Sequence, residues 1–199
     1  MTKKFIHIGC GKKNKYGTAS GFANEAWHEV RVDISAACKP DIQADMLDMH
    51  MIQSGAVDAL FSSHNLEHVF PHQVPTALAE FKRVLNHEGF MVVGCPDLEA
   101  ICQHILDGKL MEPMFETSSG RIAPIDIIYG WREALAKGEH YMAHKCGFTM
   151  DSLIAQVRAV GFNSIIGKRR GGKYDVWILA SNKKCTSDEL KQLAEQYIP

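Results

Sequence analysis

Residues 6–11 of this 199-residue chain read Ile-His-Ile-Gly-Cys-Gly, a short β-rich run that passes directly into two glycines separated by one residue. Glycine has no Cβ, so such a turn lets the backbone approach a ligand closely. We therefore predict a binding turn at Gly9, Cys10 and Gly11. The third glycine of a dinucleotide-binding G-x-G-x-x-G motif would fall at Asn14. Its absence disfavours a NAD-dependent oxidoreductase, which needs the full motif.

A second β-rich run, residues 30–32, ends at Asp33, which lies 33 − 9 = 24 residues after Gly9. A carboxylate at the end of a second strand can accept hydrogen bonds from both hydroxyls of a ribose. The glycine turn and this acid together favour a nucleoside-containing ligand without a pyrophosphate.

The chain continues as alternating strands and helices. Strands are predicted at residues 5–8, 30–32, 57–61, 90–93, 164–167 and 175–180, and helices at residues 22–27, 74–85, 150–160 and 187–197. Alternation of this kind predicts βαβ units and a parallel sheet, and the glycine-bearing link between the last two strands predicts an antiparallel hairpin. The predicted fold is α/β, a Rossmann-like doubly wound seven-stranded sheet, mostly parallel with a C-terminal antiparallel hairpin.

Composition narrows the class of function. Lys and Arg (22) nearly equal Asp and Glu (23), so no nucleic-acid or anionic-membrane partner is expected. The sequence contains no apolar run of membrane-spanning length, and its six cysteines form no C-x-x-C pair. We expect a cytoplasmic protein with one domain over residues 1–199 and a small-molecule partner. The sequence sets no oligomeric state.

One connection is too long for a simple loop. Residues 98–145 separate the fifth predicted strand from the next predicted helix, and long insertions of this kind are often lids. The segment contains Arg132, His140, Tyr141 and His144. We predict that it forms a cap over the binding crevice.

The order of five stretches extends these observations: IHIGCG, VRVDIS, ADMLDM, VDALFSSHNLEHV and EFKRVLNHEGFMVVGCPDL. Along about two-thirds of the chain this order resembles the class I S-adenosylmethionine-dependent methyltransferases. Among them the chain is most similar to a branch of small predicted methyltransferases whose fourth strand leads into a "LEH" element. The resemblance implies S-adenosylmethionine as cofactor and methyl transfer to a small-molecule or saccharide-type acceptor.

The resemblance also assigns site residues. It places Asp33 on the ribose hydroxyls, and Asp45 and Met46 beside the adenine. Cofactor binding is expected at Gly9, Cys10, Gly11, Asp33, Ile34, Asp45, Met46, Ser63 and His64. Catalytic roles are expected for His64, His144 and Tyr141, with either histidine as a general base. Acceptor contacts are expected at His68, Arg132 and His140.

The chain departs from the family pattern at His7, because the family usually has an acidic residue two places before the first glycine. The usual partner of the methionine ammonium is then missing. This departure leaves an alternative open, a protein that binds S-adenosylmethionine without turnover.

A third hypothesis comes from the stretch His64 to His68, which matches the zinc-peptidase motif H-x-x-E-H. That motif needs a helix to set both histidines on one face, yet Pro71 and Pro75 follow closely. We therefore expect no metal here, and a zinc hydrolase stays the weaker alternative.

Overall fold

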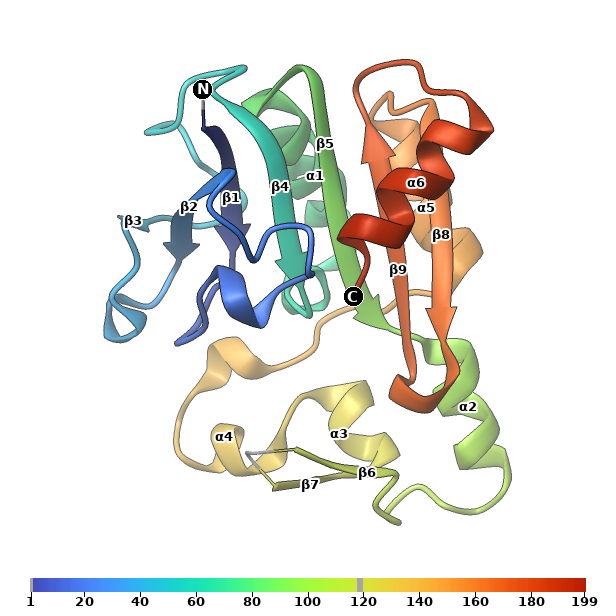
Figure 1. Cartoon of the computed structure of the whole chain (residues 1–199). Coiled ribbons are helices and arrows are strands. Elements are labelled where there is room, and N and C mark those ends of the chain that lie inside the picture. Colours follow the sequence, from blue (N-terminus) through green and yellow to red (C-terminus); the bar gives the residue numbers. More distant parts are fainter. Residues whose placement is uncertain (1, 118–119) are drawn as a thin grey trace.

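Seven strands form one sheet in the order β3-β2-β1-β4-β5-β9-β8 in the computed structural model, which describes residues 2–117 and 120–199 (Figure 1). The strands are β1 (Lys3–Ile8), β2 (Trp27–Asp33), β3 (Ile42–Gln43), β4 (Val57–Ser63), β5 (Leu85–Pro96), β8 (Ser164–Arg170) and β9 (Asp175–Ser181). The pairs from β3 to β5 are parallel, whereas β9 is antiparallel to both β5 and β8. The predicted sheet with its C-terminal hairpin is confirmed.

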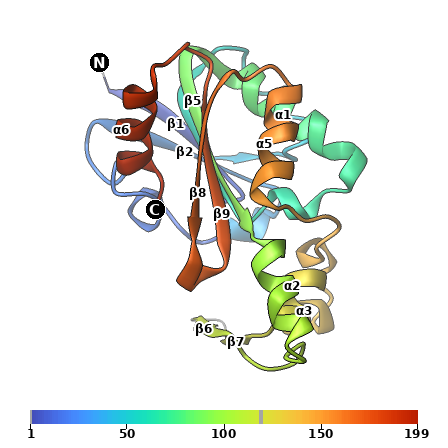
Figure 2. The same ribbon diagram turned by 90° about the vertical axis from the view of Figure 1, so that its right-hand side faces the viewer.

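Helices cover both faces of the sheet. Figure 2 shows α1 and α5 on one face and α6 on the other. The helices are α1 (Val74–Val84), α2 (Leu98–Leu106), α3 (Pro124–Tyr129), α4 (Arg132–Ala136), α5 (Met150–Ala159) and α6 (Ser187–Tyr197). Within the described residues, no helix is long and apolar enough to cross a membrane.

Alternation along the strands builds the two halves of the core. In β1, Ile6 and Ile8 pack into the cluster beneath α1 and α5, and Phe5 packs into the cluster beneath α6. Successive side chains of a strand point to opposite faces, so a strand buried on both sides reads as a continuous apolar run. This explains why the central strands were recognisable from the sequence.

The prediction of a helix at residues 22–27 is wrong. That stretch consists of turns, and Trp27 instead opens β2. The ring of Phe22 stacks on Phe5 at 4.4 Å, and the N–H of Gly21 donates to the carbonyl of Gln196 in α6 at 3.0 Å. These tertiary contacts hold the loop against α6, and they override a weak local preference for helix.

The helices predicted at residues 150–160 and 187–197 are confirmed. Helix α5 begins after Thr149, whose hydroxyl accepts from the N–H of Ser152 at 3.3 Å, and α6 spans the predicted residues. Strand β5 is longer than the predicted run at 90–93, because pairing with β4 and β9 extends the strand past its most apolar residues.

Residues 98–117 and 120–145 lie beyond the carboxyl ends of β4 and β5 (Figure 1). They contain α2, α3, α4 and a two-stranded hairpin of β6 (Phe115–Thr117) and β7 (Gly120–Ile122). Ligands of open α/β sheets bind at this carboxyl edge. The segment is therefore placed where a cap would have to lie.

Candidate active site

The turn after β1 holds both glycines in the left-handed region, with φ of 60° at Gly9 and 54° at Gly11. A Cβ on Gly9 would lie 1.9 Å from Oδ1 of Asn65, so this position admits no side chain. A Cβ on Gly11 would meet no atom within 4 Å. The first glycine therefore serves packing, and the second leaves space for a ligand.

Asn65 joins the ends of two strands. Its Nδ2 donates to the carbonyls of Ile8 and Ser63 at 3.0 and 2.9 Å, and these residues end β1 and β4. The sheet order reverses between these strands, which is the point where open α/β sheets bind ligands. Sequence reasoning missed Asn65, although its position just after a strand was a usable signal.

Asp33 is fixed before any ligand arrives. Its Oδ2 accepts from the N–H of Gly11 at 2.9 Å, and its Oδ1 accepts from the N–H of Ser35 at 2.8 Å. Each carboxylate oxygen can accept a second hydrogen bond. The predicted ribose-binding acid is thus held against the glycine turn with acceptor capacity left over.

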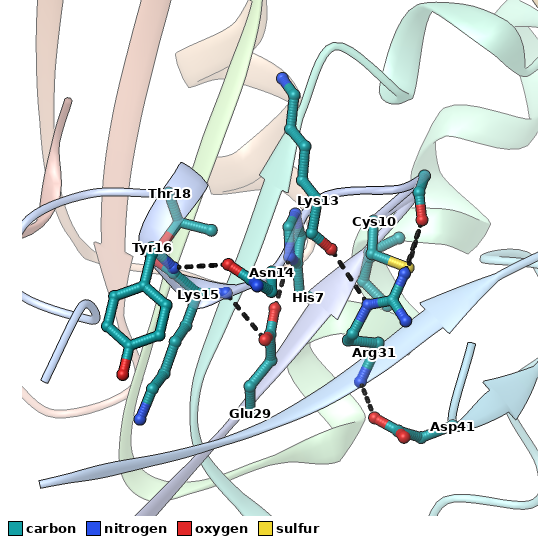
Figure 3. Close-up of polar contacts among 12 residues, drawn as sticks. His7, Cys10, Lys13, Asn14, Lys15, Tyr16, Thr18, Glu29, Arg31 and Asp41 are labelled. Atoms are coloured by element: carbon teal, nitrogen blue, oxygen red, sulfur yellow. Dashed lines mark hydrogen bonds and ion pairs between the residues drawn. The ribbon is translucent and has the colours of Figure 1, made fainter. Parts of the chain in front are cut away.

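Arg31 of β2 braces the two loops that border the site. Figure 3 shows its side chain beneath the glycine turn, reaching the carbonyl of Lys13. The guanidinium donates to the carbonyls of Gly11, Lys13, Cys38 and Lys39 at 2.6, 3.0, 3.1 and 2.8 Å. The planar fork of arginine suits several acceptors at once. No local pattern in the sequence indicated this role.

His7 stands where the family usually has an acid, and its side chain is only 3% exposed. Its Nδ1 lies 2.8 Å from Oε1 of Glu29, and Oε2 of Glu29 accepts from the N–H of Lys15 at 2.7 Å (Figure 3). The His7 side chain therefore fastens the turn to β2. His7 is not among the described residues that line the cavity beside this turn.

That cavity has a volume of about 540 Å³, within the range of ligand pockets. Its walls come from the ends of β1, β2 and β4, from the loop after β3 and from the cap. Ten of the predicted site residues line it: Gly9, Gly11, Asp33, Ile34, Asp45, Met46, Ser63, His64, His68 and Tyr141. Tertiary structure thus brings together most of the side chains that the sequence singled out.

Four predicted residues do not line this cavity: Cys10, Arg132, His140 and His144. Cys10 is buried, and that burial raises its pKa to about 11. The Nε of Arg132 donates to the buried carboxylate of Asp126 at 2.6 Å, on a separate surface hollow within the cap. Nδ1 of His144 lies 2.6 Å from the carbonyl of Ile127.

His64 directly follows β4 and has a left-handed φ of 55°, and a single 3₁₀ turn, Leu66–His68, comes next. The extended helix of a zinc-peptidase motif is therefore absent from this described stretch. The His64 ring lies 3.6 Å from Glu67 and 3.6 Å from Asp175. Desolvation disfavours its protonation, but the two carboxylates outweigh that effect and raise its pKa to about 9. As an imidazolium at neutral pH, His64 donates hydrogen bonds and cannot act as a general base.

Comparison with known proteins gives a family match and a fold match. Residues 6–93 match the family described as "Methyltransferase domain". No curated protein matches the chain. Residues 6–93 run from within β1 to most of β5, and they include Gly9, Gly11, Asp33 and His64.

Solved structures share the whole fold. An S-adenosylmethionine-dependent methyltransferase from Mesorhizobium loti is 18% identical, with 90% of this chain and 91% of that chain covered and a TM-score of 0.58. A second from Archaeoglobus fulgidus is 12% identical, with 90% and 86% covered and a TM-score of 0.56. The 1,6-didemethyltoxoflavin-N1-methyltransferase of Burkholderia thailandensis, with S-adenosylhomocysteine bound, is 13% identical, with 92% and 72% covered and a TM-score of 0.57.

Proposed function

We propose that the chain is a class I S-adenosylmethionine-dependent methyltransferase and transfers a methyl group from this cofactor to a small-molecule acceptor, saccharides included. The bound cofactor supplies a methyl group already activated by the positive charge on its sulfur. The observation that carries the proposal is the Asp33 carboxylate held on the Gly11 N–H at the edge of the cavity.

The cofactor half of the cavity suits an adenosyl group. The oxygens of Asp33 retain capacity for the ribose hydroxyls, and Gly11 leaves room for close approach. Ile34 is 52% exposed although it is a large apolar residue, and it lines the cavity beside Met46. Covering this apolar surface with the adenine ring would remove it from water, which stabilises the complex.

The other half of the cavity would receive the acceptor. Ser63, His64 and His68 from the end of β4 line it, together with Tyr141 of the cap. An activated donor needs mainly alignment and exclusion of water, effects worth about 7 to 11 kcal/mol at best. Because both ring nitrogens of His64 face carboxylates, the ring would help to position the acceptor by contact.

We extend the proposal to the cap, residues 98–145. The end of this segment, after α4, contributes Tyr141, Met142 and Lys145 to the lining of the cavity. A lid at this position would exclude water during transfer.

We also propose that the whole chain acts as one domain in the cytoplasm. All six cysteines, which lie among the described residues, are free thiols, as a reducing compartment favours.

Binding and turnover are tested separately. Isothermal calorimetry of the purified protein should give binding of S-adenosylmethionine and S-adenosylhomocysteine and none of NAD. The protein is then incubated with methyl-labelled cofactor and the small-molecule fraction of a cell extract, and labelled products are sought by chromatography. Binding without any labelled product would favour the alternative, a cofactor-binding protein without turnover. Binding of NAD alone would overturn the proposal.

A further inference from the structure

We propose that Glu67, His68 and His144 bind one divalent transition-metal ion at the acceptor end of the cavity. This goes against the expectation from the sequence, which considered only His64 and His68 on a single helix. One ligand atom from each of the three residues lies within 4.8 Å of the others. The catalytic role of the ion rests on the proposed methyl transfer, whereas its binding does not.

The backbone brings the three residues together from distant parts of the chain. Glu67 and His68 lie in the 3₁₀ turn after β4, and His144 lies at the end of the cap. The carbonyl of Glu67 accepts from the N–H groups of Lys145 and Cys146 at 2.8 and 3.2 Å. These backbone bonds hold the end of the cap against the 3₁₀ turn that contains Glu67 and His68. The positions of the ligands therefore do not depend on side-chain contacts alone.

Backbone carbonyls fix the tautomer of both histidines and leave Nε2 of each ring free to bind a metal. Nδ1 of His68 lies 3.2 Å from the carbonyl of Ala143, and Nδ1 of His144 lies 2.6 Å from the carbonyl of Ile127. A carbonyl only accepts, so each Nδ1 carries the hydrogen and each Nε2 keeps its lone pair. Metal-binding histidines are oriented by this same kind of outer hydrogen bond.

Glu67 gives the independent indication of a missing partner. Its side chain is 1% exposed, and among the described residues neither carboxylate oxygen has a hydrogen-bond partner. The nearest cationic group is Nδ1 of His64, 3.6 Å from Oε1, and His64 is shared with Asp175. A buried carboxylate is costly unless it is paired or coordinates a metal. An ion between Glu67 and the two Nε2 atoms would supply that partner.

The donor set indicates the class of metal. Two imidazoles and one carboxylate are the protein ligands of several catalytic zinc sites, and the same set holds ferrous iron elsewhere. Three ligands leave a position open for an exogenous group. Cys95 and Cys146 lie near Glu67, but neither thiol belongs to the group of three ligand atoms.

His68 lines the cavity, so the ion would border the space assigned to the acceptor. A divalent ion lowers the pKa of a bound hydroxyl and so would activate an acceptor hydroxyl for methyl transfer. The acceptor hydroxyl would release its proton to solvent. Its oxygen would then bond to the methyl carbon as the carbon–sulfur bond breaks and the electron pair stays on sulfur.

Metal content is the test. The full chain, prepared without chelators, should carry about one zinc or iron per chain by elemental analysis, and chelator-treated protein should bind one Zn²⁺ in calorimetry. His144→Ala and the isosteric Glu67→Gln should each weaken Zn²⁺ by at least about 100-fold, since even outer-shell changes cost 10- to 100-fold. The matched control His140→Ala changes an exposed histidine of the same cap segment and should leave Zn²⁺ affinity unchanged.

Thermal melts separate lost binding from lost folding. Excess Zn²⁺ should raise the Tm of the wild type and of His140→Ala but not that of Glu67→Gln. A wild type that binds no Zn²⁺, or a Glu67→Gln variant that binds it equally well, overturns the proposal. Zn²⁺ binding without S-adenosylhomocysteine binding would support the metal site and reject the proposed methyl transfer. S-adenosylhomocysteine binding without Zn²⁺ binding would reject the metal site and leave the proposed methyl transfer standing.

Discussion

The backbone N–H of Gly11 donates to the carboxylate of Asp33 across 2.9 Å, so the glycine turn of β1 and the acid at the end of β2 form one unit. Residues 22 positions apart in the sequence thereby act together on a single face of the cavity. A ligand meets a carboxylate that is already oriented, which lowers the entropy cost of binding.

Asp33→Ala should weaken S-adenosylhomocysteine binding at least about 10-fold, as measured by calorimetry. The variant loses two hydrogen bonds to a charged acceptor, each worth about 1.5 to 3 kcal/mol before compensation by water. Asp107→Asn, an exposed change at the end of α2, is the control and should bind normally. Unchanged affinity in Asp33→Ala would mean that the ribose site lies elsewhere.

Gly9→Ala and Gly11→Ala should fail in different ways although both glycines have positive φ. The methyl at Gly9 collides with Asn65, and overpacking of this kind costs about 1 to 3 kcal/mol beyond the backbone strain. Urea unfolding should show this loss, and adding Asn65→Ala should recover part of it. Gly11→Ala should lose only about 1 to 2 kcal/mol of stability, from backbone strain, but should bind the cofactor poorly. Equal stability of the two single variants would contradict the geometry.

Arg31→Lys should loosen the turns after β1 and β2. An ammonium cannot span the four carbonyls that the guanidinium reaches, so this is not a conservative change. We expect a loss of about 2 kcal/mol in urea unfolding, together with weaker cofactor binding. Arg158→Lys, on the exposed side of α5, should change neither quantity. A stable Arg31→Lys variant with normal affinity would show that the brace is dispensable.

Acid should weaken the fold through Asp175. Burial alone would raise the pKa of this carboxyl, but hydrogen bonds from Arg170 and His64 outweigh it and lower the pKa from 3.8 to about 2. A depressed carboxyl pKa stabilises the fold above the unfolded value of 3.8, and this stabilisation disappears as the pH falls from about 4 toward 2. It amounts to at most about 2.5 kcal/mol, at 1.36 kcal/mol per pKa unit.

Urea unfolding of the wild type between pH 6 and 2 should therefore show an acid-dependent loss that Asp175→Asn reduces. Arg170 and His64 stay charged throughout this range, so Asp175 is the titrating member of the group. Asp151→Asn, on the exposed surface of α5, should keep the full acid dependence. An Asp175→Asn curve parallel to that of the wild type would assign the acid sensitivity to other carboxyls.

Local signals in the sequence determined six of the seven strands of the sheet, the glycine turn, Asp33 and the C-terminal hairpin, but not the two-residue strand β3. These features depend on patterns that repeat within a few residues: apolar runs, a glycine that permits positive φ, and a hydroxyl such as Thr149 at a helix start. They also determined most of the cavity, because the carboxyl ends of neighbouring parallel strands meet at one edge.

Contacts between distant residues could be decided only by the tertiary structure. The turn at Phe22, the brace from Arg31 and the pairing of His7 with Glu29 each depend on a partner outside the local pattern. The same holds for His144, which the cap carries to within reach of Glu67 and His68. A sequence shows which residues could serve as ligands, but folding of the backbone sets the distances between them, and those distances determine whether an ion can bind.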